Sequence, residues 1–308
     1  MNKVILHHYP ESPVSEKVRV VLGLKGLSWH SVEIPRLPPR PDLMPLTGGY
    51  RQTPVMQIGA DVYCDSQCII RELERRFPEP TLYPGGGAGM VWGVSRWTDE
   101  LLFKLAITVV LGSEFHDLPD SFARDRLNVY FSADTSAATL EQAVPRALAQ
   151  LRAQFGWMAQ RLDSGRPFML GDTPGLPDAL CYYLVWFLRT RYGHGEEFLA
   201  QFPALCAWEK RVRAIGHGSP NEMDSKEALR IAKEFEPSTP IQEDKDDPEG
   251  LAPGQNVVVC GEHCVASVDG EIVSVSSESV AVGRYDPDIG RVVTHFPRVG
   301  YSVQRSAA

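Results

Sequence analysis

A proline at the start of an apolar, strand-like run is the feature that most constrains how this chain folds. The run Val55–Ile58 directly follows Thr53-Pro54, although proline cannot donate a hydrogen bond to a strand ladder. A cis peptide bond before Pro54, at the edge of a sheet, would accommodate both observations. An edge would also leave the backbone N–H and C=O of Val55 free to pair with an extended peptide. The pattern therefore predicts a peptide-binding strand that begins at Val55.

A predicted helix start lies ten residues beyond Val55. Asp65-Ser66 precedes a segment, residues 68–77, whose apolar side chains recur at helical spacing. Asp and Ser are favoured at helix starts, where the unpaired N–H groups attract a carboxylate. Together with the strand at Val55, this helix start predicts a site for a small acidic peptide.

Three short motifs stand in the order and at the separations of a known family. They are Ser12-Pro13-Val14-Ser15, then Gln52-Thr53-Pro54-Val55, then Asp65-Ser66. The order of predicted elements, β-α-β, a proline-rich connection and β-β-α, resembles a thioredoxin-like fold. In detail the chain resembles the glutathione transferase superfamily, closely over residues 3–84 and more loosely over residues 90–236.

The resemblance implies an α/β thioredoxin-like, glutathione-binding domain at residues 1–84 and an all-α bundle domain at residues 90–236. Between them, the glycine-rich residues 85–89 are typical of a flexible joint. Apolar periodicity and capping residues predict helices at 90–111, 139–162, 176–192, 204–215 and 224–236. Residues 171–178 resemble the family's start of the central bundle helix, and we interpret them as a folding element.

Residues 237–308 depart from the family pattern. An acidic, proline-rich linker at 237–250 has no apolar period. Residues 251–308 form a predicted all-β extension, with strands at 257–259, 272–275, 280–282, 292–296 and 301–303. Such strands suit a small SH3-like barrel or a sheet packed on the bundle. We expect the extension to dock on its own bundle or on a partner subunit, as a structural brace.

Ser12 and Tyr9 are the candidate catalytic residues that the resemblance implies. Disulfide-active relatives of the fold have cysteines where Ser12 and Ser15 stand, and serine cannot form a mixed disulfide. A serine hydroxyl can instead donate to a thiolate, and a hydrogen bond to a charged group contributes about 1.5–3 kcal/mol. This is enough to lower a thiol pKa from about 8.5 to near neutral. We favour Ser12, which also suits a helix cap, because it stands seven residues before Arg19, as in the serine- and cysteine-using branches. Tyr9 is the rival donor.

The resemblance also assigns the rest of the glutathione molecule to residues of this chain. Asp65 and Ser66 should receive its γ-glutamyl end, a role compatible with capping a helix. The glycyl carboxylate is expected at Gln52, with Arg51 as a weaker candidate. The extended peptide backbone is expected along Thr53, Pro54 and Val55.

Composition excludes several other classes of function. The formal net charge is −8, and residues 237–308 hold eleven acidic and five basic side chains, so no basic face for nucleic acid is expected. The longest apolar run, residues 179–188, is too short to span a membrane. Six scattered cysteines indicate reduced thiols and a cytoplasmic protein. The run Cys260-Gly-Glu-His263-Cys264 lacks a zinc-site spacing, so we expect no metal.

The sequence therefore favours a glutathione-dependent transferase that joins the glutathione thiolate to a small hydrophobic electrophile, as in detoxification. One alternative is a non-catalytic relative whose β extension binds a protein partner. Another is a glutathione-dependent reductase or isomerase, which would share the same binding site. Family resemblance further implies a homodimer, with the first domain of one chain against the bundle of the other and the site beside the interface. Such a contact would be isologous.

Overall fold

The computed structural model describes residues 3–115, 118–132, 135–261 and 267–306, and it divides into two compact units. Residues 1–18, 27–76 and 219–308 form the first, which we call the sheet unit. Residues 19–26 and 77–218 form the second, the helical unit. The helical unit thus ends earlier than the expected boundary at residue 236, because the residues after 218 join the sheet unit.

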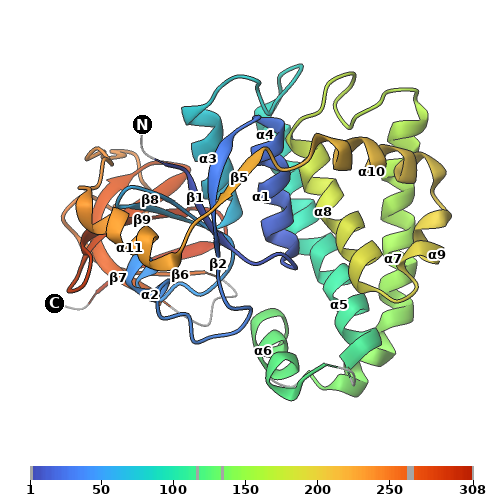
Figure 1. Ribbon diagram of the computed structural model, residues 1–308, viewed down its shortest axis with the longest axis horizontal. Helices are drawn as coiled ribbons and strands as arrows, with labels where there is room; N and C mark the ends of the chain where they lie inside the picture. The colour runs from blue at the N-terminus through green and yellow to red at the C-terminus, as the bar shows by residue number, and fades with distance from the viewer. Residues whose placement is uncertain (1–2, 116–117, 133–134, 262–266, 307–308) are drawn as a thin grey trace. The chain divides into compact units, whose positions relative to one another are not determined.

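The first part of the sheet unit alternates strands and helices, as a thioredoxin-like fold requires (Figure 1). Its elements are β1 (Ile5–His8), the start of α1 (Pro13–Leu24), β2 (Ser28–Glu33), α2 (Met44–Thr47), β3 (Val55–Ile58), β4 (Asp61–Cys64) and α3 (Ser66–Arg76). The rest of α1, from residue 19, is assigned to the helical unit. Pro13 suits the first position of α1, where a backbone N–H would have no partner within the helix. Gly26 follows α1 with a φ of 61°, a conformation that glycine adopts without strain.

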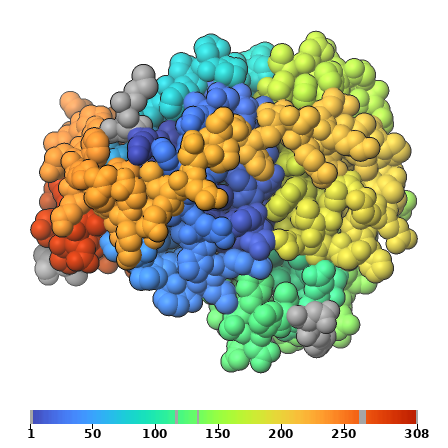
Figure 2. Space-filling model, viewed as in Figure 1, coloured from blue at the N-terminus to red at the C-terminus, as the bar shows by residue number. Residues whose placement is uncertain are grey.

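The second part of the sheet unit comes from the end of the chain and confirms the five predicted extension strands. Its elements are β5 (Ser219–Glu222), α11 (Ser225–Glu234), β6 (Asn256–Gly261), β7 (Ser267–Val275), β8 (Ser279–Asp286), β9 (Gly290–Pro297) and β10 (Tyr301–Arg305). The side chain of Asp224 caps α11, as predicted, by accepting the N–H of Lys226. In Figure 2 the orange residues, which include β5, lie against the blue residues of the first part of the chain. This agrees with the pairing of β5 with β2.

The ten strands of the described residues form one sheet, in the order β10-β6-β7-β8-β9-β4-β3-β1-β2-β5. The predicted cis bond between Thr53 and Pro54 is present. The predicted sheet edge at Val55 is wrong, because β3 lies between β1 and β4 and Val55 is in register with both His7 and Cys64. An apolar run that is buried on both faces can occupy the interior of a sheet, and the proline stands just outside it.

The extension is confirmed as a β-sheet, but it is attached differently from the predicted barrel or bundle-packed sheet. Strand β9 pairs in parallel with β4, with Asp61 opposite Val293 and Tyr63 opposite His295. The other extension strands then follow by antiparallel pairing from β9 to β8, β7, β6 and β10. The extension therefore continues the sheet of the first part of the chain.

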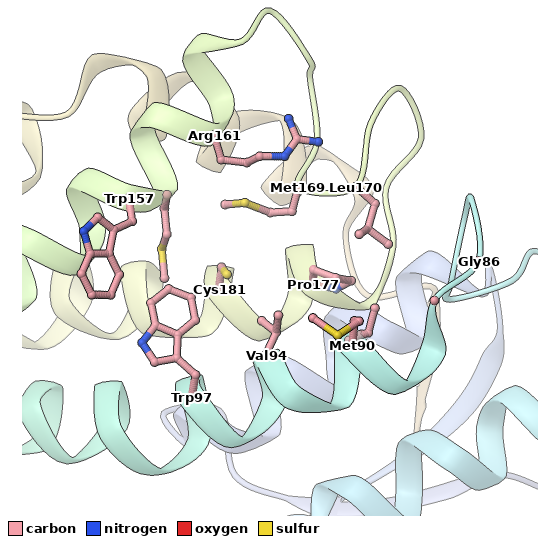
Figure 3. Close-up of a pocket in the computed structure, with 13 residues that line it drawn as sticks. Gly86, Met90, Val94, Trp97, Trp157, Arg161, Met169, Leu170, Pro177 and Cys181 are labelled. Atoms are coloured by element: carbon pink, nitrogen blue, oxygen red, sulfur yellow. The ribbon is translucent and has the colours of Figure 1, made fainter.

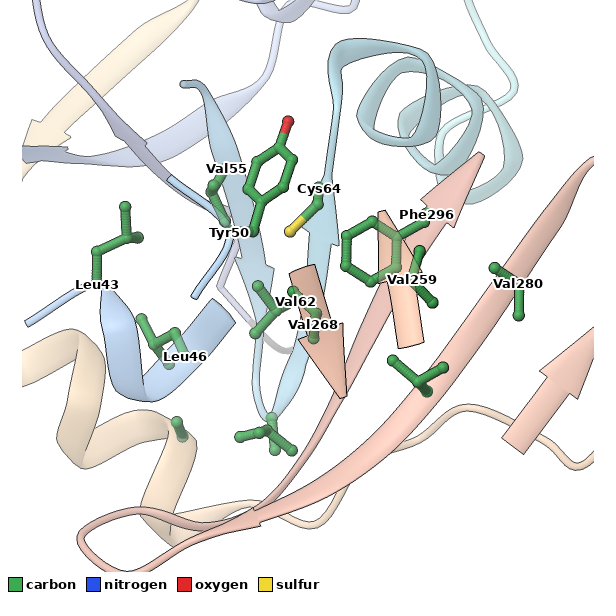
Figure 4. Close-up of a cluster of buried hydrophobic side chains, with 14 of the residues drawn as sticks. Leu43, Leu46, Tyr50, Val55, Val62, Cys64, Val259, Val268, Val280 and Phe296 are labelled. Atoms are coloured by element: carbon green, nitrogen blue, oxygen red, sulfur yellow. The ribbon is translucent and has the colours of Figure 1, made fainter. Parts of the chain in front are cut away.

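One apolar core is shared by both parts of the sheet unit. It contains Tyr50, Val62 and Cys64 from the first part, together with Val280 and Phe296 from the extension (Figure 4). Three buried residues of α11, Ala228, Ile231 and Ala232, belong to the same cluster. The expectation that this last helix belongs to the bundle is therefore not met, since its apolar face is covered within the sheet unit.

The helical unit contains the predicted long helices. Its elements are α4 (Ala88–Arg96), a π-helical turn η1 (Trp97–Leu102), α5 (Phe103–Glu114), α6 (Asp120–Tyr130), α7 (Ala137–Asp163), α8 (Leu176–Arg191), α9 (Gly195–Ala200) and α10 (Pro203–Ile215). Helix α7 begins two residues before the predicted start at Thr139, because Ser136 is its cap and accepts the N–H of Thr139.

The segment before α8 is the folding element that the sequence predicted. Asp178 is fully buried, and its carboxylate accepts the N–H groups of Gly175 and Met169 and the indole N–H of Trp208. Burial raises the pKa of Asp178 above its ordinary value, while the three hydrogen bonds oppose that rise. One carboxylate thus joins the preceding loop, the start of α8 and helix α10.

Candidate functional site

Sheet register brings the candidate residues together at one end of the sheet unit. Val55 lies opposite His7 in β1 and opposite Cys64 in β4. The segment that follows β1 leads to Ser12, the segment before β3 holds Thr53 and Pro54, and Asp65 directly follows β4. Three loops with candidate residues therefore meet at the same end of three adjacent strands.

Ser12 is placed at the start of α1. Its Oγ accepts the backbone N–H of Ser15 at 3.2 Å, and its own N–H donates to the Tyr9 carbonyl at 3.2 Å. Ser12 therefore is a helix cap, and the cap uses its oxygen only as an acceptor. Because a hydroxyl also carries one proton, Ser12 keeps a donor for a ligand. The residue is only 2% exposed, and shielding from water strengthens a hydrogen bond to an anion.

Asp65 and Ser66 form the start of α3, as predicted. Asp65 has a φ of 73°, so it stands in the left-handed conformation that Asp tolerates better than most residues. Its Oδ1 accepts the N–H of Gln67 at 2.8 Å, which is the geometry of a helix cap. Ser66 is the first residue of α3 and is buried. The site therefore presents a carboxylate beside the N-terminus of a helix of eleven residues.

The loop before β3 is held by a buried arginine that sequence reasoning missed. Arg40 donates to the Thr53 hydroxyl at 2.9 Å and to the carbonyls of Pro35, Arg36 and Arg51. One guanidinium with five N–H groups can satisfy several carbonyls of an irregular loop at once. Arg40 thereby fixes the segment that leads to Gln52 and Pro54.

The side chains of Tyr9, Cys64 and Cys68 are buried in the protein interior. Tyr9 is buried within the shared apolar core, although its backbone carbonyl contacts Ser12. Cys64 and Cys68 are buried and are not joined in a disulfide. Burial raises the pKa of the Cys68 thiol well above its ordinary value, so this thiol is poorly suited to attack as a thiolate.

A polar cluster binds the linker to the sheet close to β4. Asp61 accepts hydrogen bonds from the N–H and hydroxyl of Ser238 and from the hydroxyl of Thr239, and it lies 3.4 Å from His295 Nε2. Burial alone would raise the pKa of Asp61, but the hydrogen bonds from His295, Thr239 and Ser238 outweigh it and hold the pKa at about 2. The His295 ring also stacks on Tyr63, with centroids 4.3 Å apart. The start of the linker, at Ser238 and Thr239, is thus fixed to the sheet although the linker has no apolar period.

The helical unit contains an apolar cavity of about 570 Å³ (Figure 3). Helix α4 and the π-helical turn contribute Met90, Val94 and Trp97, and α7 contributes Trp157 and Arg161. Met90 is 80% exposed and Trp157 is 57% exposed, so large apolar side chains face solvent at this cavity. Trp97 also lines this cavity, whereas Phe103 of the following helix is buried.

Within residues 3–115, 118–132, 135–261 and 267–306, no three His, Cys, Asp or Glu side chains are grouped so as to hold a metal ion. His263 and Cys264 lie outside the described residues. Among the helices of these same ranges, none has the length and apolar character needed to cross a bilayer.

Comparison with known proteins agrees with this geometry. Residues 6–81 match the family described as glutathione S-transferase, N-terminal domain, and residues 141–211 match glutathione S-transferase, C-terminal domain. The solved structure of a GST-like protein from Pseudomonas syringae is 34% identical, with a TM-score of 0.79, over 99% of this chain and 100% of its own. This chain therefore belongs to the glutathione S-transferase superfamily and is a glutathione transferase-like enzyme.

Two curated proteins are also similar in sequence to this chain. The chain is 28% identical to a probable glutathione S-transferase of Oryza sativa subsp. japonica, GSTU6, over 66% of this chain and 81% of that protein. It is 26% identical to a maleylpyruvate isomerase of a Ralstonia species, over 58% of this chain and 77% of that protein. The family uses glutathione as a substrate, and both relatives are less similar to this chain than the Pseudomonas protein is.

Proposed function

We propose that this enzyme binds glutathione at the end of the sheet formed by β1, β3 and β4 and joins its thiolate to a small hydrophobic electrophile. The observation that carries the proposal is the convergence of Ser12, Pro54 and Asp65 on that end. A tripeptide with a thiol in the middle and a charged group at each end requires separate contacts of this kind. The family membership reported above supports glutathione as that tripeptide.

Ser12 would stabilise the thiolate. When the glutathione thiol loses its proton to solvent, the Ser12 hydroxyl donates to the sulfur, and the N-terminus of α1 favours the negative charge as well. The thiolate then attacks an electrophilic carbon, so that a C–S bond forms and the electron pair of the broken bond leaves with the leaving group. Lowering the thiol pKa raises the fraction of thiolate at neutral pH, and this fraction limits the rate.

Asp65 and Ser66 would hold the γ-glutamyl end. This end carries an ammonium group and a carboxylate, and the site offers one partner for each. The Asp65 carboxylate complements the ammonium, and the first N–H groups of α3 complement the carboxylate. Gln52 remains our proposed contact for the glycyl carboxylate, with its loop fixed by Arg40.

The decisive experiment compares two serines of the same motif. We expect Ser12→Ala to slow conjugation of a chromogenic electrophile near pH 7 and to move the pH–rate profile upward by about one to two pH units. Ser15→Ala is the matched control, because the Ser15 hydroxyl is buried without a hydrogen-bond partner and should not affect the profile. If Tyr9→Phe moves the profile and Ser12→Ala does not, the thiolate is held by Tyr9. If neither variant differs from the wild type, the proposed chemistry is wrong.

An isomerase reaction is a second candidate, and the Ralstonia maleylpyruvate isomerase is the observation that favours it. In such a reaction the same thiolate adds to a double bond, the bond rotates, and the thiolate leaves again, so glutathione is regenerated. Product analysis separates the two candidates. A transferase yields a glutathione conjugate, whereas an isomerase consumes no glutathione.

We also propose that two copies associate, with the first domain of one copy against the helical unit of the other at the face where the cavity lies. Exposed Met90 and Trp157 make an apolar surface there, and monomeric proteins rarely leave such a patch uncovered. The family's tendency to dimerise supports a second copy as the occupant. Light scattering at micromolar concentration should show a dimer that Trp157→Glu dissociates. Ile241→Glu, at a residue equally exposed to solvent as Met90, should leave the dimer intact, and a wild-type monomer would contradict the proposal.

A further inference from the structure

The last strand of the extension brings a tyrosine to the candidate glutathione site. The Tyr301 hydroxyl donates to Asp65 Oδ2 at 3.2 Å, while Asp65 Oδ1 accepts the N–H of Gln67 at 2.8 Å. The two oxygens of the carboxylate are thus oriented by different elements, Oδ2 by β10 and Oδ1 by α3. Tyr301 is separated from Asp65 by 236 residues in sequence, so no local pattern could have indicated the contact.

The Tyr301 ring is held in place by the shared core. Strand β10 pairs with β6 at this residue, and the ring packs against Phe296 with centroids 5.6 Å apart. Phe296 in turn packs against Tyr50 at 6.0 Å, and Figure 4 shows both rings in the same buried cluster. The Tyr301 and Tyr50 hydroxyls are 3.5 Å apart. Tyr301 is therefore a packed residue with a directed hydroxyl, unlike Tyr285 of the same extension, which is 76% exposed.

The Tyr301 hydroxyl stays protonated under ordinary conditions. Burial, followed by the proximity of Tyr50 and Asp65, raises the pKa of Tyr301 well above its ordinary value. At neutral pH the group is consequently a hydrogen-bond donor, which is the role that a neighbouring carboxylate requires.

We propose that Tyr301 is a positioning residue of the glutathione site, which orients the Asp65 carboxylate toward the ammonium of the γ-glutamyl group. The inference rests on the proposed function, and it makes the C-terminal extension part of the binding site. Each carboxylate oxygen can accept two hydrogen bonds, so Oδ2 can accept from Tyr301 and from the ammonium together. A carboxylate that is already oriented loses less conformational freedom when the ligand binds.

The test compares two proteins with two ligands by calorimetry. Tyr301→Phe removes one oxygen and keeps the ring that packs on Phe296, so the fold is retained. The ligands are glutathione and glutaryl-cysteinyl-glycine, which lacks the α-amino group of the γ-glutamyl residue. We expect Tyr301→Phe to weaken glutathione binding about three- to tenfold and to leave binding of the des-amino ligand unchanged. Tyr285→Phe should alter neither affinity.

Two results would overturn the inference while leaving the proposed function intact. One is an unchanged affinity of Tyr301→Phe for glutathione. The other is an equal loss for both ligands, because a general disturbance of the site would not depend on the amino group. Failure of the wild type to bind millimolar glutathione would instead refute the proposed function, and the role of Tyr301 with it.

Discussion

The two parts of the sheet unit meet along β4 and β9, and they differ in how their sequences specify them. The first part is specified by local sequence signals, which are a capped helix start at Ser12, a proline before β3 and a second cap at Asp65. The extension carries ordinary strand and turn signals, and its attachment depends on contacts between residues far apart in sequence. The difference teaches that a segment without any site motif can still be built into the fold and reach the site.

Contacts at the junction show how closely the two parts are joined. Arg71 forms an ion pair with Glu278 at 2.6 Å, and Arg284 donates to the carbonyl of Pro45. Gly48 lies beside the Arg284 side chain and has a φ of 68°, a backbone conformation that glycine adopts without strain. The extension thus packs against the loops as well as against the strand of the first part.

Among the changes that test this comparison, removal of the extension should reduce the stability of the sheet unit most. A chain that ends after Glu236 loses β9 and the extension side of the shared core, so Tyr50, Val62 and Cys64 become exposed. We expect the sheet unit to lose cooperative thermal unfolding and the protein to aggregate, as circular dichroism and size-exclusion chromatography would show. A chain that ends after Ser306 serves as the control. A soluble truncated protein with the melting temperature of the full chain would mean that the first part folds alone.

A single core residue of the extension should have the next largest effect. Phe296 is 1% exposed and contacts the rings of both Tyr50 and Tyr301. Truncating a buried Phe to Ala costs about 3–5 kcal/mol, so Phe296→Ala should lower the free energy of unfolding in urea by that amount. The exposed Tyr285 provides the control, and its replacement by Ala should change the free energy by less than about 0.5 kcal/mol. Equal effects of the two substitutions would contradict a shared core.

The smallest effect concerns Asp61, which binds the linker to the sheet. Its pKa of about 2 lies below the ordinary 3.8, so its ionised form stabilises the folded state by about 2 kcal/mol. Because the folded pKa is the lower one, this contribution is complete above pH 3.8 and is lost as the pH falls toward 2. Asp61→Asn should therefore be less stable than the wild type at pH 5, and the gap should narrow toward pH 3. A gap that does not change with pH would contradict this account.

Most of the first part of the sheet unit was predictable because its signals are local. The cis bond at Pro54 and the start of α3 each depend on a few neighbouring residues, as does the cap at Asp224 in the second part. The expected edge at Val55 failed for the opposite reason, since a short apolar run does not reveal how many strands flank it. The same limit applies to α11, whose apolar face is evident in the sequence but whose covering surface is not.

The candidate site was predictable only as far as its motifs extend. Asp65 and Ser66 were found because capping residues stand out beside helical periodicity, whereas Ser12 was implied by the family resemblance. Arg40 and Tyr301 were missed, because a buried arginine in an irregular loop and a tyrosine in a distant strand look like ordinary surface and core residues. Only the contacts that Arg40 and Tyr301 make in the folded structure identify them as part of the site. Alternating apolar residues at 301–303 predicted the strand, and they carried no information about Asp65.

Because β4 pairs with β9, the sheet can be completed only late in the synthesis of the chain. Asp61 emerges from the ribosome long before its partner Val293, and at 5–20 residues per second the interval is roughly ten to fifty seconds. Throughout that interval one edge of β4 has no paired strand, and the apolar residues around Tyr50 are not yet buried by the extension. A nascent chain in this state is open to wrong strand pairing, so completion of the sheet depends on the arrival of its last strands.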